Sequence, residues 1–524
     1  MARVLVADAI AEEGIRRLRE HADVDVRLRE PAAALREIIA EYEALVVRSE
    51  TRVDAALIEA ATRLRVIGRA GAGVDNIDIE AATRRGILVL NAPSGNTVAA
   101  AEHAMAMMLA LARHVPQADQ AVRAGRWERS RFVGTELKDK VLGLIGLGNI
   151  GSEVARRAQA FGMQVIAADR VVSEDRAAQL RVKLLSLEEV LSQADFLSLH
   201  VPLTPETRHL IGVRALARLK PTCRLINVAR GGVVDESALF DALSEGRLAG
   251  AALDVFEREP PGENPLLRLP EVISTPHLGA STEEAQITVA VDVADQIVTV
   301  LQGGQPRFAL NAPVVLPEQM AFLQPFLKVV EGIGRFYAQV ARGPSTRLVV
   351  EYSGEIARYD SSVLTASLLT AFLSRFSEDR VNPVNARAVA AERGITVMEQ
   401  RSTQASEFSN LVTLIAEGDR GRTRVSGTLL LGEAHIVYLD DFRIDLVPEG
   451  TFLMSWHADR PGIVGAIGTL LGQHNINIAS MQVGRNRPRG DAVMILTVDE
   501  PVPESLRARL REIPGMAELQ YVTV

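Results

Sequence analysis

The sequence predicts an α/β protein of several domains built around a doubly wound parallel sheet. Three observations support this fold class: the chain has 524 residues, short apolar runs alternate with helical patterns over its first half, and a glycine-rich turn joins a strand to a helix at residues 141–151. A chain of this length exceeds one ordinary domain, so three or four domains are expected. Hydrophobic residues make up 47% and charged residues 24% of the chain, which is a globular composition.

The first 95 residues are predicted to form a small α/β domain with a parallel sheet. Five short apolar runs are the candidate strands, and the segments between them, such as IAEEGIRRLREH, have helical spacing. These runs read RVLVAD, VDVRL, ALVVRS, RVIGRAG and ILVLNAP in chain order. A long helical pattern follows over residues 97–125, and its Met and Leu stripe indicates core packing rather than a cofactor contact.

The glycine-rich turn reads VLGLIGLGNIG and has the order strand, turn, helix start. Gly146 permits a tight turn, Gly148 lets the backbone approach a pyrophosphate, and Gly151 lets the new helix pack close to its strand. The helix N-terminus would present unpaired N–H groups and the positive end of its dipole to the phosphates. The turn therefore predicts a Rossmann-type domain that binds a dinucleotide.

The acid at the end of the next apolar run, MQVIAAD, favours NAD as that dinucleotide. Asp169 could accept hydrogen bonds from both ribose hydroxyls, and its charge would repel a 2′-phosphate. Arg170 beside it could tolerate NADP, but Asp169 makes NAD the better prediction.

The nucleotide unit is expected to continue to about residue 280, with further strands at FLSLHVP, RLINVAR, GAALDVF and VISTPH. A helix over about 281–302 could then carry the chain back onto the first domain and make that domain discontinuous. After Asn311 the pattern changes, and the last 74 residues read β-α-β-β-α-β, a ferredoxin-like arrangement. The domains expected are 1–97 with 287–312, then 98–286, then 318–450, then 451–524.

Three segments after predicted strands hold residues suited to catalysis. NVARGGVVDE contains Arg230, ALDVFEREPP contains Glu257 and Glu259, and STPHLGAST contains His277. Strand carboxyl ends line the ligand crevice of an open α/β sheet, so these side chains should converge beside the cofactor. A His is suited to move a hydroxyl proton, a carboxylate to orient that His, and an Arg to bind a planar carboxylate with two hydrogen bonds. The set fits hydride transfer at a 2-hydroxy acid.

These motifs resemble the D-isomer-specific 2-hydroxyacid dehydrogenases. The resemblance covers about residues 1–310 and rests on GLGNIG, LHVPLTPETRHLI, NVARGGVVDE, ALDVFEREP and PHLGAST. The whole chain is similar to the long form of the family, with a flavodoxin-like discontinuous substrate domain, an α+β intervening domain and a ferredoxin-like ACT domain. The resemblance implies NAD-dependent oxidation of 3-phospho-D-glycerate, the first committed step of serine synthesis.

By the same resemblance, Arg230 binds the substrate carboxylate, His277 is the general acid/base, and Glu259 is its paired acid, because Glu259 and not Glu257 directly precedes Pro260. Arg48 and Arg69 are candidates for the phosphate, with the backbone of Ala70, Gly71 and Ala72 facing the carboxylate; surface positions at strand ends are the alternative for both arginines. The implied cofactor residues are Gly146, Gly148, Asn149, Ile150, Gly151, Asp169, Val201, Val228, Ala229, Arg230, Asp254, His277 and Gly279.

The ACT-like region carries WHADRPGIVGAIGTLL and then NINIAS. The resemblance implies an L-serine effector site at a subunit interface that involves Asp459, Gly462 and Asn477, and hence feedback inhibition. Asp459 could instead be only a helix N-cap, and His457 stands where an aromatic residue could serve. A homotetramer or homodimer is expected, since such dehydrogenases and ACT units pair.

Composition narrows the remaining function classes. The net charge of −8 argues against non-specific nucleic-acid binding, and the one cysteine, Cys223, excludes an intramolecular disulfide and a Cys-based zinc cluster, so no metal site is expected. The N-terminus reads as a strand rather than a signal peptide, and no apolar run is long enough for a membrane span, so a cytoplasmic protein is expected. Two rival functions stay open: a reductase of glyoxylate, hydroxypyruvate or another 2-keto acid, and a non-metabolic regulator that senses NADH.

Overall fold

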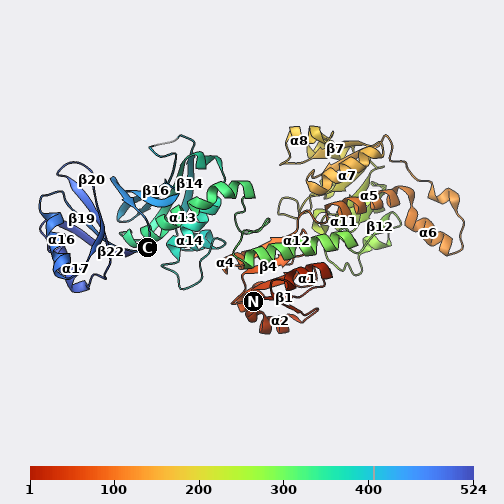
Figure 1. The fold of residues 1–524 in the computed structure, drawn as a ribbon. Helices are drawn as coiled ribbons and strands as arrows, with labels where there is room; N and C mark the ends of the chain where they lie inside the picture. The colour runs from red at the N-terminus through yellow and green to blue at the C-terminus, as the bar shows by residue number, and fades with distance from the viewer. Residues whose placement is uncertain (405–406) are drawn as a thin grey trace.

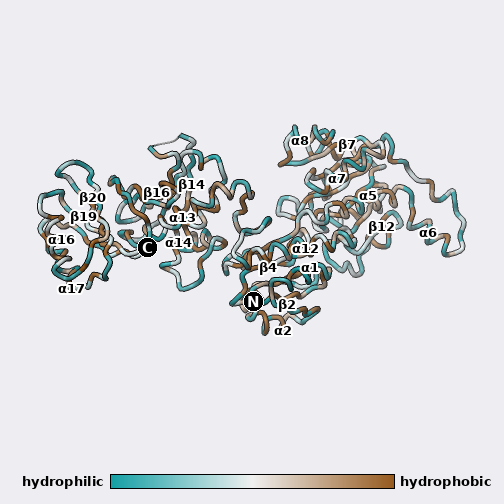
Figure 2. Tube along the Cα trace, viewed as in Figure 1, coloured by the Kyte–Doolittle hydropathy of each residue, from teal (hydrophilic) through white to brown (hydrophobic). Residues whose placement is uncertain are grey.

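The computed structural model describes residues 1–404 and 407–524, which form four units along the chain (Figure 1). Each unit is built on its own β-sheet, and the four sheets have five, seven, six and four strands. The outer loops and turns are mostly hydrophilic, as Figure 2 shows. The predicted fold class is confirmed: two parallel α/β sheets are followed by two mainly antiparallel α+β units. Among the described residues, no helix is both long and apolar enough to cross a membrane.

The first unit has a parallel sheet with the strand order β2-β1-β3-β4-β5, the flavodoxin-like order. Helix α12 (Glu283–Leu301) returns from the second unit and packs on this sheet and on α1, so two separate chain segments build the unit. The close approach depends on Gly14, where an added Cβ would lie 2.8 Å from the Ala290 Cβ. The other elements are β1 (Arg3–Val6), α1 (Glu12–Arg19), β2 (Asp23–Val26), α2 (Ala32–Ile38), β3 (Ala44–Val47), α3 (Ala55–Ala60), β4 (Val66–Arg69), α4 (Ile79–Arg84) and β5 (Leu88–Asn91).

The second unit has a seven-stranded parallel sheet with the order β12-β11-β10-β9-β6-β7-β8. Numbered from β6, this is the doubly wound order 3-2-1-4-5-6 with one further strand, and its order reverses beside β6. Its strands are β6 (Val141–Ile145), β7 (Gln164–Ala168), β8 (Lys183–Leu184), β9 (Phe196–Leu199), β10 (Arg224–Asn227), β11 (Gly250–Leu253) and β12 (Val272–Ser274). Its helices are α5 (Thr97–Arg113), α6 (Val115–Arg123), α7 (Asn149–Ala160), α8 (Glu174–Gln179), α9 (Leu187–Gln193), α10 (Val213–Leu216) and α11 (Glu236–Ser244).

The long helical pattern over residues 97–125 forms two helices rather than one. His114 adopts a left-handed backbone conformation with φ of 52° between α5 and α6, and Pro116 stands in the first turn of α6. A left-handed residue ends a helix, and a proline is well accommodated in the first turn of the next one. Helix α5 packs on α7, β10 and β11, whereas α6 extends away from the body of the unit (Figure 1).

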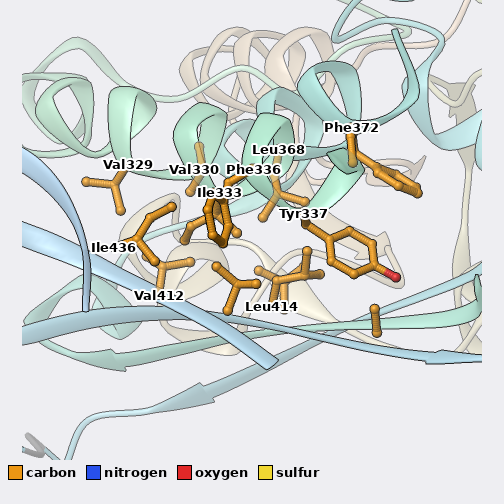
Figure 3. Close-up of a cluster of buried hydrophobic side chains, with 14 of the residues drawn as sticks. Val329, Val330, Ile333, Phe336, Tyr337, Leu368, Phe372, Val412, Leu414 and Ile436 are labelled. Carbon is orange, nitrogen blue, oxygen red and sulfur yellow. The ribbon is translucent and has the colours of Figure 1, made fainter. Parts of the chain in front are cut away.

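The third unit places α13 (Pro317–Val340) and α14 (Ser362–Leu373) against a six-stranded sheet of order β14-β13-β15-β16-β17-β18. Figure 3 shows the core between these layers: Ile333 and Phe336 of α13 and Leu368 of α14 lie above Leu414 of the sheet. The other elements are β13 (Ser345–Gly354), α15 (Ala386–Glu392), β14 (Thr396–Ser402), β15 (Asn410–Gly418), β16 (Gly421–Leu430), β17 (Glu433–Leu439) and β18 (Phe442–Leu446).

The fourth unit is an antiparallel sheet of order β20-β21-β19-β22 with two helices on one face, which is the ferredoxin-like topology. The other face contributes Phe452, Met454 and Trp456 to the same apolar cluster that holds α13 and α14, so the third and fourth units share one core. Its elements are β19 (Thr451–Ala458), α16 (Ile463–Gln473), β20 (Ile478–Arg485), β21 (Asp491–Val498), α17 (Glu504–Arg511) and β22 (Met516–Thr523).

Candidate active site

The glycine turn between β6 and α7 forms an open cradle at a helix N-terminus. Gly146 has φ of 96°, and a Cβ there would lie 2.5 Å from the His200 carbonyl oxygen, so only glycine fits. Gly148 is the N-cap of α7, with no side chain to cap the helix and nothing within 4 Å of its Cβ position. A Cβ on Gly151 would lie 2.2 Å from the Gly146 carbonyl oxygen. Asn149 and Ile150 begin the helix, so the free N–H groups face a space suited to a pyrophosphate.

Asp169, at the end of β7, lies beside this cradle. Its carboxylate accepts hydrogen bonds from the backbone N–H groups of Leu147 at 2.7 Å, Val171 at 2.8 Å and Val172 at 3.0 Å. Partial burial opposes the charge, but these three bonds outweigh it and hold the pKa of Asp169 below its usual value. A carboxylate has about four acceptor positions, so one is left, enough for one ribose hydroxyl and not for the two that the sequence predicted. Arg170 beside it is exposed.

The remaining predicted cofactor residues gather at the carboxyl ends of the neighbouring strands. Val201 follows β9, and its Cγ1 would lie 3.0 Å from a Cβ on Gly146. Val228 and Ala229 follow β10, and a Cβ on Gly279 would lie 3.0 Å from the Val228 Cγ1. The structure thus places Val201 and the glycine turn where the strand order reverses, and Val228 and Gly279 further along the same carboxyl edge of the sheet.

His277 and Glu259 form a hydrogen-bonded pair at the same edge of the sheet. The distance from His277 Nδ1 to Glu259 Oε2 is 2.8 Å, and Glu259 Oε1 accepts from the Phe256 N–H at 3.1 Å. Partial burial of Glu259 opposes its charge, but the His277 bond prevails and lowers the pKa of this carboxyl. Because Nδ1 is occupied, Nε2 is the ring nitrogen left for a ligand.

The competing acid, Glu257, lies in a different network. Its Oε1 is 3.1 Å from His209 Nε2 and accepts from the Glu236 backbone N–H at 3.2 Å, at the start of α11. The residue pattern alone did not decide which of the two acids pairs with the histidine. In the structure, Glu259 contacts His277, and Glu257 caps a helix.

Arg230 lies across the cleft between the first two units. Its Nε donates to Asp75 Oδ2 at 2.9 Å, and its Nη1 donates to the Ala229 carbonyl at 2.7 Å. Gly73 permits this approach, since a Cβ there would lie 1.9 Å from Arg230 Nη2. Asp75 was not predicted from the sequence, because its partner Arg230 is 155 residues away and nothing local marks the contact.

Arg48 and Arg69 line the opposite wall of this cleft, which has a volume of about 630 Å³ and is also lined by residues 70–73, Glu259 and His277. Asn76 joins the two arginines: its Oδ1 accepts from Arg69 Nε at 3.1 Å and its Nδ2 donates to the Arg48 carbonyl at 3.0 Å. Burial and the nearby Arg230 lower the pKa of Arg69 to about 10, which leaves it charged at neutral pH. Three guanidinium groups therefore face one cleft and favour an anionic ligand.

The backbone of Ala70, Gly71 and Ala72 is held in place by the end of β5. Asn91 Nδ2 donates to the Ala72 carbonyl at 2.6 Å, and the Ala92 N–H donates to the Gly71 carbonyl at 3.0 Å. These bonds fix the loop that lines the cleft opposite His277.

Two of the predicted effector residues, Asp459 and Gly462, lie at the start of α16 in the fourth unit, whereas Asn477 follows the end of this helix and lies at the opposite end of the sheet. Gly462, with φ of 96°, is the N-cap, so Asp459 does not cap the helix. Instead, Asp459 Oδ2 accepts from the Arg489 N–H at 2.9 Å, and this bond lowers the pKa of the carboxyl. Asn477 Nδ2 donates to Asp499 Oδ2 at 2.6 Å. His457 is buried, and burial lowers its pKa.

A doubly wound nucleotide domain, a flavodoxin-like domain, and an Arg and a Glu–His pair at the cleft between them define the D-isomer-specific 2-hydroxyacid dehydrogenases. Residues 105–279 match the family model for the NAD-binding domain of these enzymes. Residues 322–439 match the D-3-phosphoglycerate dehydrogenase intervening domain, and residues 452–515 match the ACT domain.

Similar proteins give the particular family. A D-3-phosphoglycerate dehydrogenase of Synechocystis is 48% identical over all of this chain and 95% of its own length. One from Bacillus subtilis is 41% identical over all of this chain and 99% of its own length. A D-lactate dehydrogenase from Aquifex aeolicus, solved with NAD and lactic acid, has 29% identity and a TM-score of 0.52 over 57% of this chain and 96% of its own. The chain belongs to the D-3-phosphoglycerate dehydrogenase family, and its cofactor is NAD.

We expect Asp169→Asn to weaken NADH binding about tenfold and to reduce discrimination against NADPH, because a charge-assisted hydrogen bond is worth about 1.5–3 kcal/mol. Fluorescence titration with both cofactors measures this. Asp195→Asn is the matched control, since Asp195 accepts from the Val141 N–H and from Lys220 and lies outside the cradle. Equal NADH affinities for Asp169→Asn and the wild type would contradict the role of Asp169.

Proposed function

We propose that this protein oxidises 3-phospho-D-glycerate to 3-phosphooxypyruvate with NAD, in the cytoplasm. The observation that carries the proposal is the hydrogen-bonded His277–Glu259 pair in a cleft that three arginines also line. The names of the relatives support the choice of substrate, because they match this chain along its full length. A pure NADH sensor would have no need of an acid/base pair in that position.

The cradle between β6 and α7 would hold the pyrophosphate, and Asp169 the adenine ribose. Gly148 leaves room for the phosphates, and the uncapped start of α7 supplies N–H donors. When bound, the nicotinamide ring accepts the hydride that leaves C2 of the substrate. The carboxyl ends of β10 and β11 would place that ring near His277, with Val228 and Gly279 against it.

His277 would take the proton of the substrate hydroxyl at Nε2 as the hydride departs. Glu259, held by its second hydrogen bond to the Phe256 N–H, orients the imidazole and stabilises the imidazolium that forms. In the reverse direction the imidazolium returns its proton to the carbonyl oxygen. The lowered pKa of Glu259 suits this role, because the carboxylate stays charged at neutral pH.

The two ends of the substrate would contact different walls of the cleft. Arg230 would pair with the substrate carboxylate, and this carboxylate must compete with Asp75 for the guanidinium. The backbone of residues 70–72 would contact the substrate carboxylate from the other side. Arg48 and Arg69 would receive the phosphate, because a dianion favours guanidinium partners. This division leaves C2 between Arg230 and His277.

The central test is NADH formation from a set of acids, with removal of the keto-acid product. We expect 3-phosphoglycerate to be oxidised at least a hundredfold more efficiently than unphosphorylated D-glycerate or D-lactate, because only the phosphate engages Arg48 and Arg69. Arg48→Ala should narrow this ratio by raising KM for the phosphorylated acid alone. Preference for an unphosphorylated acid, or for reduction of glyoxylate, would identify a different dehydrogenase of the same fold.

The two candidate acids can be separated by matched variants. We expect Glu259→Gln to lower kcat about 10²-fold or more, since general acid–base assistance contributes about 10²–10⁴-fold, and to leave NADH affinity within about twofold. Glu257→Gln, which changes the helix-capping acid two residues away, should stay within about threefold of the wild type. Steady-state kinetics and NADH titration measure both. A larger loss for Glu257→Gln would reverse the assignment.

We propose L-serine as a feedback inhibitor that binds beside α16, and a homodimer or homotetramer as the functional form. A helix N-terminus that is free of a side-chain cap offers N–H donors to a carboxylate, and Asp459 beside it offers a partner for an ammonium. Asn477 lies at the opposite end of the same sheet, so it would reach this ligand from a second subunit at the interface. The ACT match supports effector binding of this kind.

Calorimetric titration with L-serine tests this proposal. We expect Asn477→Ala to weaken serine binding about tenfold and to shift the inhibition curve equally, without changing uninhibited kcat. Glu449→Gln, on the turn before β19, is the control and should bind serine normally. No heat of binding and no inhibition in the wild type would remove the serine proposal and leave the dehydrogenase proposal standing.

A further inference from the structure

The loop that carries His277 is tied to one buried carboxylate. Asp254, at the end of β11, accepts from the Leu278 N–H at 2.7 Å and from the Gly279 N–H at 2.9 Å, and its carbonyl accepts from the His277 N–H at 2.9 Å. Its side chain is 1% exposed. His277 itself has φ of 55°, a conformation that a non-glycine residue keeps only when its surroundings enforce it. The Asp254 contacts hold three consecutive residues of the loop, in addition to the bond from the His277 N–H to the Thr275 carbonyl and the His277–Glu259 bond.

A second histidine, His103, provides a further hydrogen-bond donor to this carboxylate. His103, on α5, places Nε2 at 3.2 Å from Asp254 Oδ1 and at 3.1 Å from Thr275 Oγ1. The Thr275 hydroxyl donates to Asp254 Oδ1 at 2.6 Å, so its oxygen is free to accept a hydrogen bond. Only a proton on His103 Nε2 satisfies both neighbours. His103 therefore acts as a donor here, whatever its charge.

The consequence of losing this donor follows from the burial of Asp254. Burial disfavours the charged form of Asp254. The hydrogen bonds from His103 and Thr275 are the strongest opposing contributions, and they hold the pKa of Asp254 low. A buried carboxylate that loses a donor must find another, take up a proton or admit water. Each of these changes the acceptor on which the Leu278 and Gly279 amides depend.

We propose that His103 is a positioning residue for His277. It donates its Nε2 proton to the Asp254–Thr275 pair and so keeps the loop 275–279 in the one conformation that places His277 against Glu259. This inference rests on the proposed function of His277 as the acid/base. It assigns a role to a helix residue that touches neither the cleft nor the glycine cradle.

The test compares His103→Gln with His103→Leu. The glutamine amide can donate from about the position of Nε2, whereas leucine has similar bulk and no donor. We expect His103→Leu to lower kcat at least tenfold, with KM for 3-phosphoglycerate within about threefold of the wild type. His103→Gln should recover most of kcat. Equal kcat for His103→Leu and the wild type, or equal losses for both variants, would overturn the proposal.

Hydrogen exchange supplies a readout that does not depend on turnover. The amides of residues 277–279 should exchange at least tenfold faster in His103→Leu than in the wild type, and at nearly the wild-type rate in His103→Gln. If the wild type oxidises no 2-hydroxy acid, the proposed function fails, and faster exchange would still support the positioning role. Unchanged exchange in His103→Leu would refute that role even if the enzyme is active.

Should His103→Leu not fold, Thr275→Val and Thr275→Ser test the same pair from the other side. Valine removes the hydroxyl and keeps the shape, so we expect a loss of kcat and faster exchange of the Leu278 amide. Serine keeps the hydroxyl and should behave as the wild type. Wild-type kcat and wild-type exchange for Thr275→Val would overturn the proposal.

Discussion

The arrangement of the candidate active site, at the carboxyl ends of the strands of the second unit, depends on the buried carboxylate of Asp254. Parallel strands deliver their carboxyl ends to one edge of the sheet, but they do not determine the path of the loops that follow. Asp254 determines that path for the last of these loops, because its two oxygens and its carbonyl together bind three consecutive amides. Its charge persists in a buried site because Thr275, Leu278 and Gly279 donate to its carboxylate, with His103 Nε2 at 3.2 Å. The hydrogen bonds of Asp254 to the loop therefore determine the direction in which the His277 side chain points.

The cleft between the first and second units has a second constraint, because positively charged side chains from both units face it. Arg69 and Arg230 belong to different units, and burial together with the charge of Arg230 lowers the pKa of Arg69. Asp75 partly offsets this repulsion in the structure through its contact with Arg230. An anion that enters the cleft would offset the repulsion between the two arginines in place of Asp75. The same positive charges would therefore favour both ligand binding and the approach of the first and second units.

The sequence predicted the parts of the fold that depend on local patterns. Strand periodicity located the sheets of the first, second and fourth units, and Gly146 and Asp169 marked the nucleotide crevice, because a tight turn and a strand-end acid have local signatures. It did not predict contacts made by folding alone. His103 stands in a helical stripe that reads as core, and its partner is about 150 residues away. Asp75 was missed for the same reason. The break at His114 has a local signal in Pro116, which the long apolar stripe outweighed.

The core shared by the third and fourth units has a consequence for dissecting the chain. Phe452, Met454 and Trp456, together with Val493, Ile495 and Val522, belong to the apolar cluster that holds α13, α14 and their sheet. A protein truncated before residue 451 would present that face to water, and an exposed apolar surface of this kind promotes association and aggregation. Deletion of the C-terminal module would therefore confound loss of an effector site with loss of solubility. Point substitutions near α16 keep the two effects apart.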